Sequence, residues 1–238
     1  MASVFFQRLI KLFLLLFVSS LLHAQEYRFE IGGFTGSSFY MGDANKNTLF
    51  KGLNPALGGI FRYNPNFRWA FKGNLGWAKI SGNTKGLNNV FPHNTQVSFE
   101  RDLIELDGQM EFNFFPYSDK YVYMNTQKLT PYVLFGLGAT VALGSSRMFA
   151  GINIPLGVGV KYKVINRVNL GLEFSFRKLF KDGLDTTNDG NALLDDPYNT
   201  NDSWLKNNDW YSMLLFSATW DFALRCKPCN NIRHLTEY

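Results

Sequence analysis

Few residues of this chain could do chemistry, and the clearest pair is Cys226 and Cys229, its two cysteines. A C-x-x-C spacing suits a redox centre or half of a metal site. A redox enzyme is disfavoured because no thioredoxin-like pattern of strands and helices surrounds the pair. Structural zinc needs four ligands, and only His234 is near. We expect a disulfide, formed either between these cysteines or with a partner protein.

A second candidate is the segment 181–208, which is rich in aspartate. Five of its residues fall at positions 1, 3, 5, 6 and 12 of a calcium-loop pattern: Asp185, Thr187, Asp189, Gly190 and Asp196. The match is imperfect, since Thr replaces the third-position acid and Asp replaces the bidentate Glu. We interpret the segment as a hydrated loop, with calcium binding as the alternative.

The other residues give little support to catalysis. Beyond residue 24 the histidines are His93, in a loop, and His234, in the tail, and neither lies at a strand end beside a serine. No G-x-S-x-G, H-E-x-x-H or phosphate-loop pattern occurs. The sequence therefore predicts no catalytic residue, no metal site and no cofactor. A lipid-modifying enzyme with a site at the rim is a lesser alternative.

The repeating element of the chain is a stretch of about ten residues in which apolar and polar side chains alternate. In the clearest example, Trp69, Phe71, Leu75 and Trp77 share one face. An apolar face that begins and ends with Trp fits a lipid-facing band between aromatic girdles. Eight strands are expected, at residues 26–35, 55–64, 67–80, 98–115, 130–143, 150–164, 167–180 and 209–224.

These strands predict an all-β protein, an eight-stranded antiparallel transmembrane β-barrel. Tight turns at 64–66 and 165–166 contrast with long connections at 36–54, 81–97 and 181–208. Outer-membrane barrels place short turns in the periplasm and long loops outside. The mean hydropathy of −0.13 is too low for a helical membrane protein, whereas a barrel needs an apolar residue only at every second position.

Residues 1–24 are interpreted as an N-terminal signal peptide, because Arg8 and Lys11 are followed by an apolar run and Ala24 is a plausible cleavage residue. Residues 25–224 then form the barrel, and 225–238 form a periplasmic C-terminal tail. The expected location is the bacterial outer membrane. Without the signal, 22 basic and 19 acidic side chains give a formal charge of +3, which disfavours a nucleic-acid partner.

Side-chain parity places nearly balanced charges inside the barrel, since carboxylates cannot face hydrocarbon cheaply. The inward charges are Arg28, Glu30, Arg62, Lys72, Glu105, Asp107, Glu111, Lys161, Glu173, Arg177 and Asp221. Eight strands leave just enough room for side chains to fill the barrel. Buried charges persist only when they are paired. We therefore predict a plugged, salt-bridged lumen rather than a pore, with conduction as the alternative.

Four motifs of the chain stand out: residues 40–43, residues 54–58, Pro131 and Tyr132 with Gly136 and Gly138, and residues 154–163. Together they resemble the PorG family, the small outer-membrane barrel of the type IX secretion system of Bacteroidetes-type bacteria. The resemblance covers nearly the whole mature chain. It implies a structural role beside a periplasmic ring made of a lipoprotein and its partner subunit. The alternative is a generic small outer-membrane barrel for adhesion or envelope integrity.

A closed barrel must contact periplasmic partners through its periplasmic segments, the turn 116–129 and the tail. The turn contains Tyr117, Lys120, Tyr121 and Tyr123, an aromatic and basic composition common at interfaces. An aromatic belt at the membrane boundary is the alternative for these residues. The expected partners are this ring and the lipids of the outer membrane. No small-molecule substrate is expected.

Overall fold

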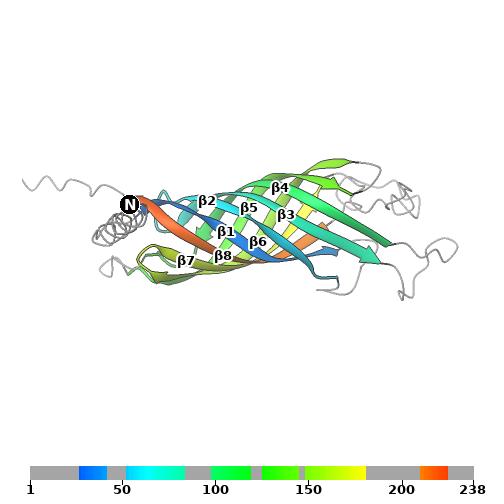
Figure 1. Cartoon of the computed structure of the whole chain (residues 1–238). Coiled ribbons are helices and arrows are strands. Elements are labelled where there is room, and N and C mark those ends of the chain that lie inside the picture. The colour runs from blue at the N-terminus through cyan, green and yellow to red at the C-terminus, as the bar shows by residue number, and fades with distance from the viewer. Residues whose placement is uncertain are drawn as a thin grey trace, which may run out of the picture. The chain divides into compact units, whose positions relative to one another are not determined.

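The eight strands form one closed antiparallel barrel in which each strand pairs with its neighbours in sequence, from β1 round to β8 (Figure 1). The computed structural model describes residues 27–41, 52–83, 98–118, 125–144, 148–180 and 210–224. The strands are β1 (Tyr27–Met41), β2 (Asn54–Tyr63), β3 (Trp69–Asn83), β4 (Ser98–Asn113), β5 (Leu129–Leu143), β6 (Phe149–Ile165), β7 (Val168–Leu179) and β8 (Trp210–Leu224). None of the described residues belong to a helix long and apolar enough to cross a membrane.

The predicted fold class is confirmed, and most strand boundaries agree within a few residues. The exception is β1, which was expected at 26–35 and continues to Met41. Its second half contains Gly36, Ser37 and Ser38 in a row and lacks alternation, so the sequence favoured a loop there. In the structure this half still pairs with β2, as far as Ser38 opposite Asn54. Some predicted features lie outside the described residues: the signal peptide, His93, the segment 181–208 and the tail with its cysteines.

The two ends of the barrel differ in their connections. At one end β6 turns into β7 through Asn166 and Arg167, with Ile165 opposite Val168. The β2–β3 turn at the same end is fixed by Asn66, whose side-chain oxygen accepts bonds from the backbone N–H of Arg68 at 3.0 Å and of Trp69 at 2.8 Å. We call this end, with the connections 64–68, 114–128 and 166–167, the turn rim. We expect the turn rim to face the periplasm, because outer-membrane barrels keep their short turns there.

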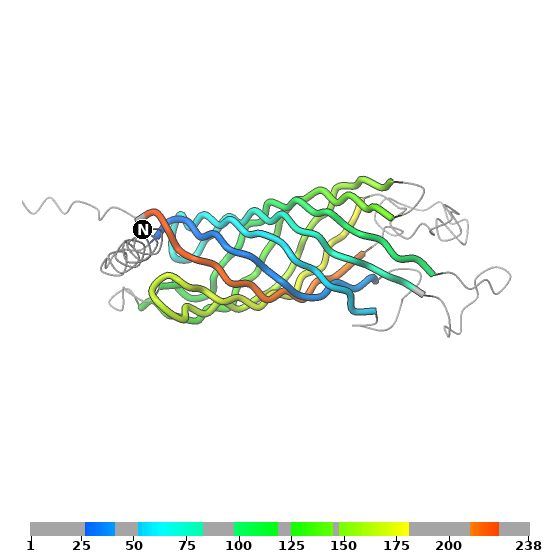
Figure 2. Tube along the Cα trace, viewed as in Figure 1, coloured from blue at the N-terminus to red at the C-terminus, as the bar shows by residue number. Residues whose placement is uncertain are grey.

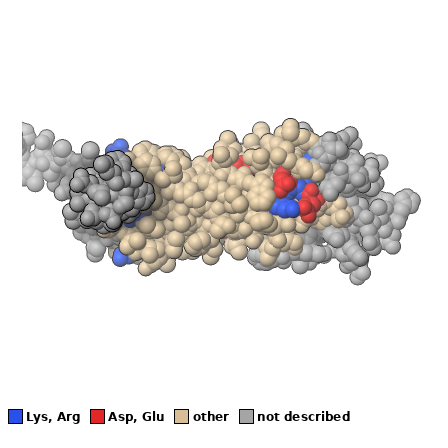
Figure 3. All heavy atoms as spheres, viewed as in Figure 1, with Lys and Arg blue, Asp and Glu red and all other residues tan. Residues whose placement is uncertain are grey.

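The outer face of the barrel is apolar. Along β4 the side chains are alternately exposed and buried, with Ile104, Leu106 and Met110 outside. The space-filling view shows a wide uncharged surface between the two ends (Figure 3). Leu75, Leu106 and Leu137 are each about 60% exposed (59%, 61% and 60%), and so wide an apolar surface fits contact with lipid. The chain is thus a membrane-spanning barrel of the outer-membrane type.

The strands run obliquely to the barrel axis, as the tube trace shows (Figure 2). Tilt is a condition of closing a small sheet into a barrel, and it brings residues distant in sequence to one level. The interior then fills with side chains. Toward the end opposite the turn rim, the filling is apolar and includes Ile80, Phe99, Leu103, Leu179 and Met213. Toward the turn rim it is charged.

Candidate functional site: the lumen network and the turn rim

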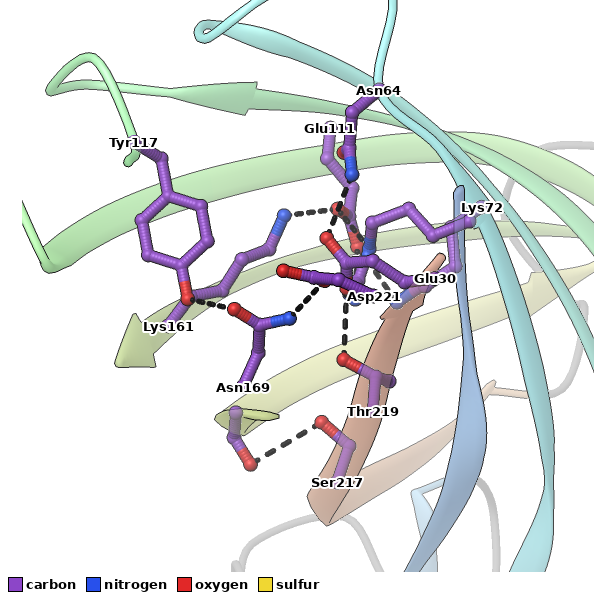
Figure 4. Close-up of polar contacts among 12 residues, drawn as sticks. Glu30, Asn64, Lys72, Glu111, Tyr117, Lys161, Asn169, Ser217, Thr219 and Asp221 are labelled. Carbon is purple, nitrogen blue, oxygen red and sulfur yellow. Dashed lines mark hydrogen bonds and ion pairs between the residues drawn. The ribbon is translucent and has the colours of Figure 1, made fainter. Parts of the chain in front are cut away.

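The centre of the charged half is Glu111 on β4, which has no exposed side-chain surface. Nε of Arg62 lies 2.9 Å from one of its oxygens, and Nζ of Lys72 lies 3.2 Å from the other. Lys161 makes a third ion pair to the same carboxylate. Figure 4 shows Lys72 and Lys161 reaching Glu111 from different strands. One carboxylate therefore joins β2, β3, β4 and β6 through the lumen.

Two further carboxylates complete this group. Glu30 pairs with Arg62 and accepts hydrogen bonds from Asn64 and from Thr219, each at 2.8 Å. Glu173 lies 2.5 Å from Nζ of Lys72. The six charged residues, which we call the lumen network, are Glu30, Arg62, Lys72, Glu111, Lys161 and Glu173. Three cations balance three carboxylates, which is the condition for keeping buried charges in a stable protein.

A second polar group lies next to the turn rim. Nζ of Lys163 is 2.7 Å from Asp221, and the amide of Asn169 donates to the same carboxylate at 2.5 Å. The hydroxyl of Tyr117 donates to the side-chain oxygen of Asn169 at 2.8 Å. Tyr117 belongs to the described start of the β4–β5 connection, and its side chain points inward to Asn169 (Figure 4).

A third group occupies the middle of the barrel. Arg177 lies 2.5 Å from Glu105 and 3.7 Å from Asp107. The hydroxyl of Tyr211 donates to Glu105 at 2.7 Å and is 2.8 Å from the hydroxyl of Thr140. All five side chains are buried. Polar groups thus fill the interior at three levels. The apolar cluster fills it farther toward the end opposite the turn rim.

These contacts confirm a plugged, salt-bridged lumen. The described interior holds polar side chains that bind one another, including the hydroxyl of Thr219, which donates to Glu30 at 2.8 Å. Within the described ranges, no group of three His, Cys, Asp or Glu side chains is placed to hold a metal ion. The arrangement can hold strands together and close the barrel, so any partner would meet the barrel at its rims or its outer face.

The family model described as a domain of unknown function (DUF6089) matches residues 7–232. The chain belongs to the DUF6089 family. Among curated proteins, none matches the sequence.

Several solved structures are similar to this DUF6089 chain. Neisserial surface protein A is 14% identical with a TM-score of 0.52, over 82% of this chain and 97% of its own. Ail of Yersinia pestis is 12% identical with a TM-score of 0.43, over 83% and 99%. OprG of Pseudomonas aeruginosa is 14% identical with a TM-score of 0.43, over 83% and 97%. At 14% identity, the likeness to Neisserial surface protein A shows the fold alone.

Ten of the eleven charges predicted for the lumen of the DUF6089 barrel are buried inside it, and Arg28 is not. Arg28 has the inward parity of Glu30, but its side chain is exposed. The physical reason is its position near the start of β1, where the strand leaves the filled lumen and water solvates the guanidinium. Parity assigns a face of a strand and does not show where the barrel ends.

One predicted partner contact needs correction. Tyr117 is 8% exposed and its hydroxyl is bound to Asn169, so it is not available to a partner. A tyrosine in a turn can bury its ring and still satisfy its hydroxyl inside a polar lumen, which the sequence interpretation did not consider. Lys120, Tyr121 and Tyr123 lie outside the described residues.

Sequence reasoning also missed buried members of this DUF6089 interior. Lys163 has the parity of Lys161 on β6, and Arg101 has the parity of Glu105 on β4, so the alternation itself could have found both. Tyr132 was a harder case, because an aromatic residue fits either face. Its hydroxyl donates to Glu173 at 2.8 Å, and its ring lies under Nζ of Lys161 at 4.5 Å.

Proposed function

We propose that this chain is a structural component of the outer membrane that acts through its rims, as part of a protein secretion machine of the type IX kind. The observation that carries the structural role is the lumen network, which ties strands on several sides of the barrel together around Glu111. A closed interior leaves the rims and the lipid-facing surface as the places where the protein can act.

The network also argues against transport through the barrel. A solute would have to displace paired charges, and breaking one buried ion pair costs about 3–5 kcal/mol. The described lumen network contains five ion pairs between carboxylates and cations. Because these pairs share partners, opening the lumen means breaking several of them together. The apolar cluster around Leu103 would then have to open as well.

The secretion role rests on the resemblance of several segments to the PorG family. Two of those segments line the closed barrel: residues 54–58 lie in β2, and residues 154–163 lie in β6. The proposed partner is a periplasmic ring of a lipoprotein and its partner subunit. The turn rim is the surface that such a ring would meet if this barrel, like other outer-membrane barrels, keeps its short turns in the periplasm.

We expect the purified protein to show no stable conductance in a planar lipid bilayer, because the lumen is filled at each level. The measurement is single-channel recording, with a porin inserted into the same bilayer as the positive control. Insertion of the protein is checked independently by its recovery in the membrane fraction. Reproducible steps of uniform size from the folded protein would overturn the structural role.

The partner is tested by shortening the β4–β5 connection. The stems of this connection are already joined, since the backbone N–H of Gln127 donates to Pro116 at 2.8 Å and that of Ser118 donates to Gln127 at 3.1 Å. Deleting residues 119–124 should therefore keep the barrel and Tyr117 in place. We expect at least about a tenfold loss of the ring subunits cross-linked to the barrel in intact cells, as for an interface that loses its anchoring side chains.

The matched control deletes six residues, 88–93, from a connection at the opposite rim. This deletion should leave the cross-linked partners unchanged. If the turn variant recovers as much ring as the intact protein, the turn rim is not the docking surface. If no ring subunit is trapped even by the intact protein, the secretion role is wrong and a generic envelope barrel becomes the better interpretation.

A further inference from the structure

The lipid-facing surface of β2 to β5 contains a groove of about 480 Å³. Four outward positions form one row across these strands, since Phe61 pairs with Gly73, Gly73 with Gly108, and Gly108 with Leu137. The two central positions carry no side chain. The neighbouring row toward the turn rim is bulky throughout and consists of Tyr63, Phe71, Met110 and Phe135. The groove is thus a gap with a glycine floor and aromatic walls.

The barrel itself does not require glycine at these two positions. A Cβ at Gly73 would have its nearest neighbours at 3.9 Å, and so would a Cβ at Gly108. By contrast, a Cβ at Gly157 would lie 2.5 Å from a backbone oxygen of β7. Neither Gly73 nor Gly108 has a positive φ. Close packing therefore explains Gly157, whereas neither close packing nor backbone strain explains the two glycines of the groove, where the missing side chains leave room for a ligand.

Exposed basic side chains lie at the turn rim, the end of the barrel toward which the bulky row of the groove faces. Arg68 is exposed in the β2–β3 turn, where its guanidinium donates to the backbone oxygen of Phe114 at 2.9 Å. Arg28 is exposed beside the same turn, since its backbone oxygen accepts from Asn64 at 2.7 Å. Among the described residues, every exposed charge at the turn rim is basic. Basic and no acidic side chains are visible at this end of the barrel in Figure 3.

We propose that this groove binds one acyl chain of an anionic phospholipid whose phosphate is held at the turn rim by Arg68. The distances fit. Gly73 lies four residues along β3 from Trp69. At about 3.3 Å per residue and a tilt near 40°, this is about 10 Å along the barrel axis. Half of a bilayer core is about 15 Å thick, so the groove lies within the periplasmic leaflet.

The chemistry of the groove matches this occupant. Its lining is almost wholly apolar, with the rings of Phe61, Phe71 and Phe135 around the gap. A methylene chain buried there gains contact with surfaces on both sides, which a flat lipid-facing wall cannot supply. A guanidinium binds a phosphate with two parallel hydrogen bonds. The pairing of an apolar slot with a basic rim favours a lipid with a negative headgroup over a zwitterionic one.

The test is native mass spectrometry of the full barrel with phosphatidylglycerol or phosphatidylethanolamine added as the probe lipid. We expect the intact protein to retain one phosphatidylglycerol with an affinity about tenfold above that for phosphatidylethanolamine. The double variant Gly73→Leu with Gly108→Leu fills the groove and should lower phosphatidylglycerol affinity about tenfold. Arg68→Gln should remove the preference between the two lipids.

Two matched controls separate this site from general effects. Gly59→Leu adds a side chain at an outward glycine of β2 that does not line the groove and whose Cβ has its nearest neighbour at 3.9 Å. Lys128→Gln removes an exposed basic charge at the same rim. Both should bind like the intact protein. Unchanged retention in the filled-groove variant, or an equal loss in Gly59→Leu, would overturn the proposal. Neither outcome depends on a secretion partner.

Discussion

Replacing Glu111 by Gln should lower the free energy of unfolding by about 3–5 kcal/mol, the cost of removing one partner from a buried ion pair. The amide keeps the shape of the side chain but removes the charge that Arg62, Lys72 and Lys161 share. Arg62 retains Glu30, and Lys72 retains Glu173. Within the described residues Lys161 has no second close ion pair, so its buried ammonium would keep only the attraction of Glu30 and a hydrogen bond to Asn113 at 3.3 Å.

The measurement is equilibrium unfolding by urea in lipid vesicles, followed by the migration of unheated protein on a gel. Glu100→Gln is the control on the same strand. Its carboxylate also pairs with a lysine, Lys79, at 2.5 Å, but the Glu100 side chain is 59% exposed. Surface pairs contribute at most about 1 kcal/mol. Equal losses in the two variants would show that the lumen network does not stabilise the barrel.

Replacing Gly36 by Ala is expected to destabilise closure of the barrel by at least about 3 kcal/mol, at the upper end of overpacking effects. A methyl group at this position of β1 would overlap the backbone oxygen of Leu214 and lie 2.9 Å from Cα of Leu215. Both atoms belong to the backbone of β8, so no rotamer change can relieve the overlap. The first and last strands would have to separate where the barrel closes.

The fraction of protein that refolds into vesicles as a heat-modifiable barrel reports this effect. Gly59→Ala provides the comparison, because a Cβ there meets its nearest neighbour at 3.9 Å. That variant should be neutral or more stable by up to about 1 kcal/mol, since alanine loses less backbone entropy on folding. Normal refolding of Gly36→Ala would mean that β1 and β8 lie farther apart than described.

The fold was accessible from the sequence because two physical rules act on every strand. Side chains alternate between faces with a period of two, and hydrocarbon rejects charge. Strand β4 shows both rules, with Glu105, Asp107 and Glu111 inside and Ile104 and Leu106 outside. The same rules wrongly placed Arg28 inside the lumen. The alternation of side chains tells which face of a strand a residue is on, but not how far along the barrel axis the filled lumen extends.

The pairing of the interior charges was not accessible in this way. Glu111 is separated by 49 residues from Arg62 and by 50 from Lys161, and the tilt of the strands decides that they meet. The inward fold of Tyr117 likewise depends on Asn169, 52 residues away.

The sequence by itself therefore determined a membrane barrel of eight strands and the face of most of its side chains. Tertiary structure decided which acid neutralises which base, how the lumen is closed, and where two glycines leave a groove in the lipid-facing wall. The physical reason is that alternation is a local property of each strand. Tilt and register, in contrast, are properties of the whole closed sheet.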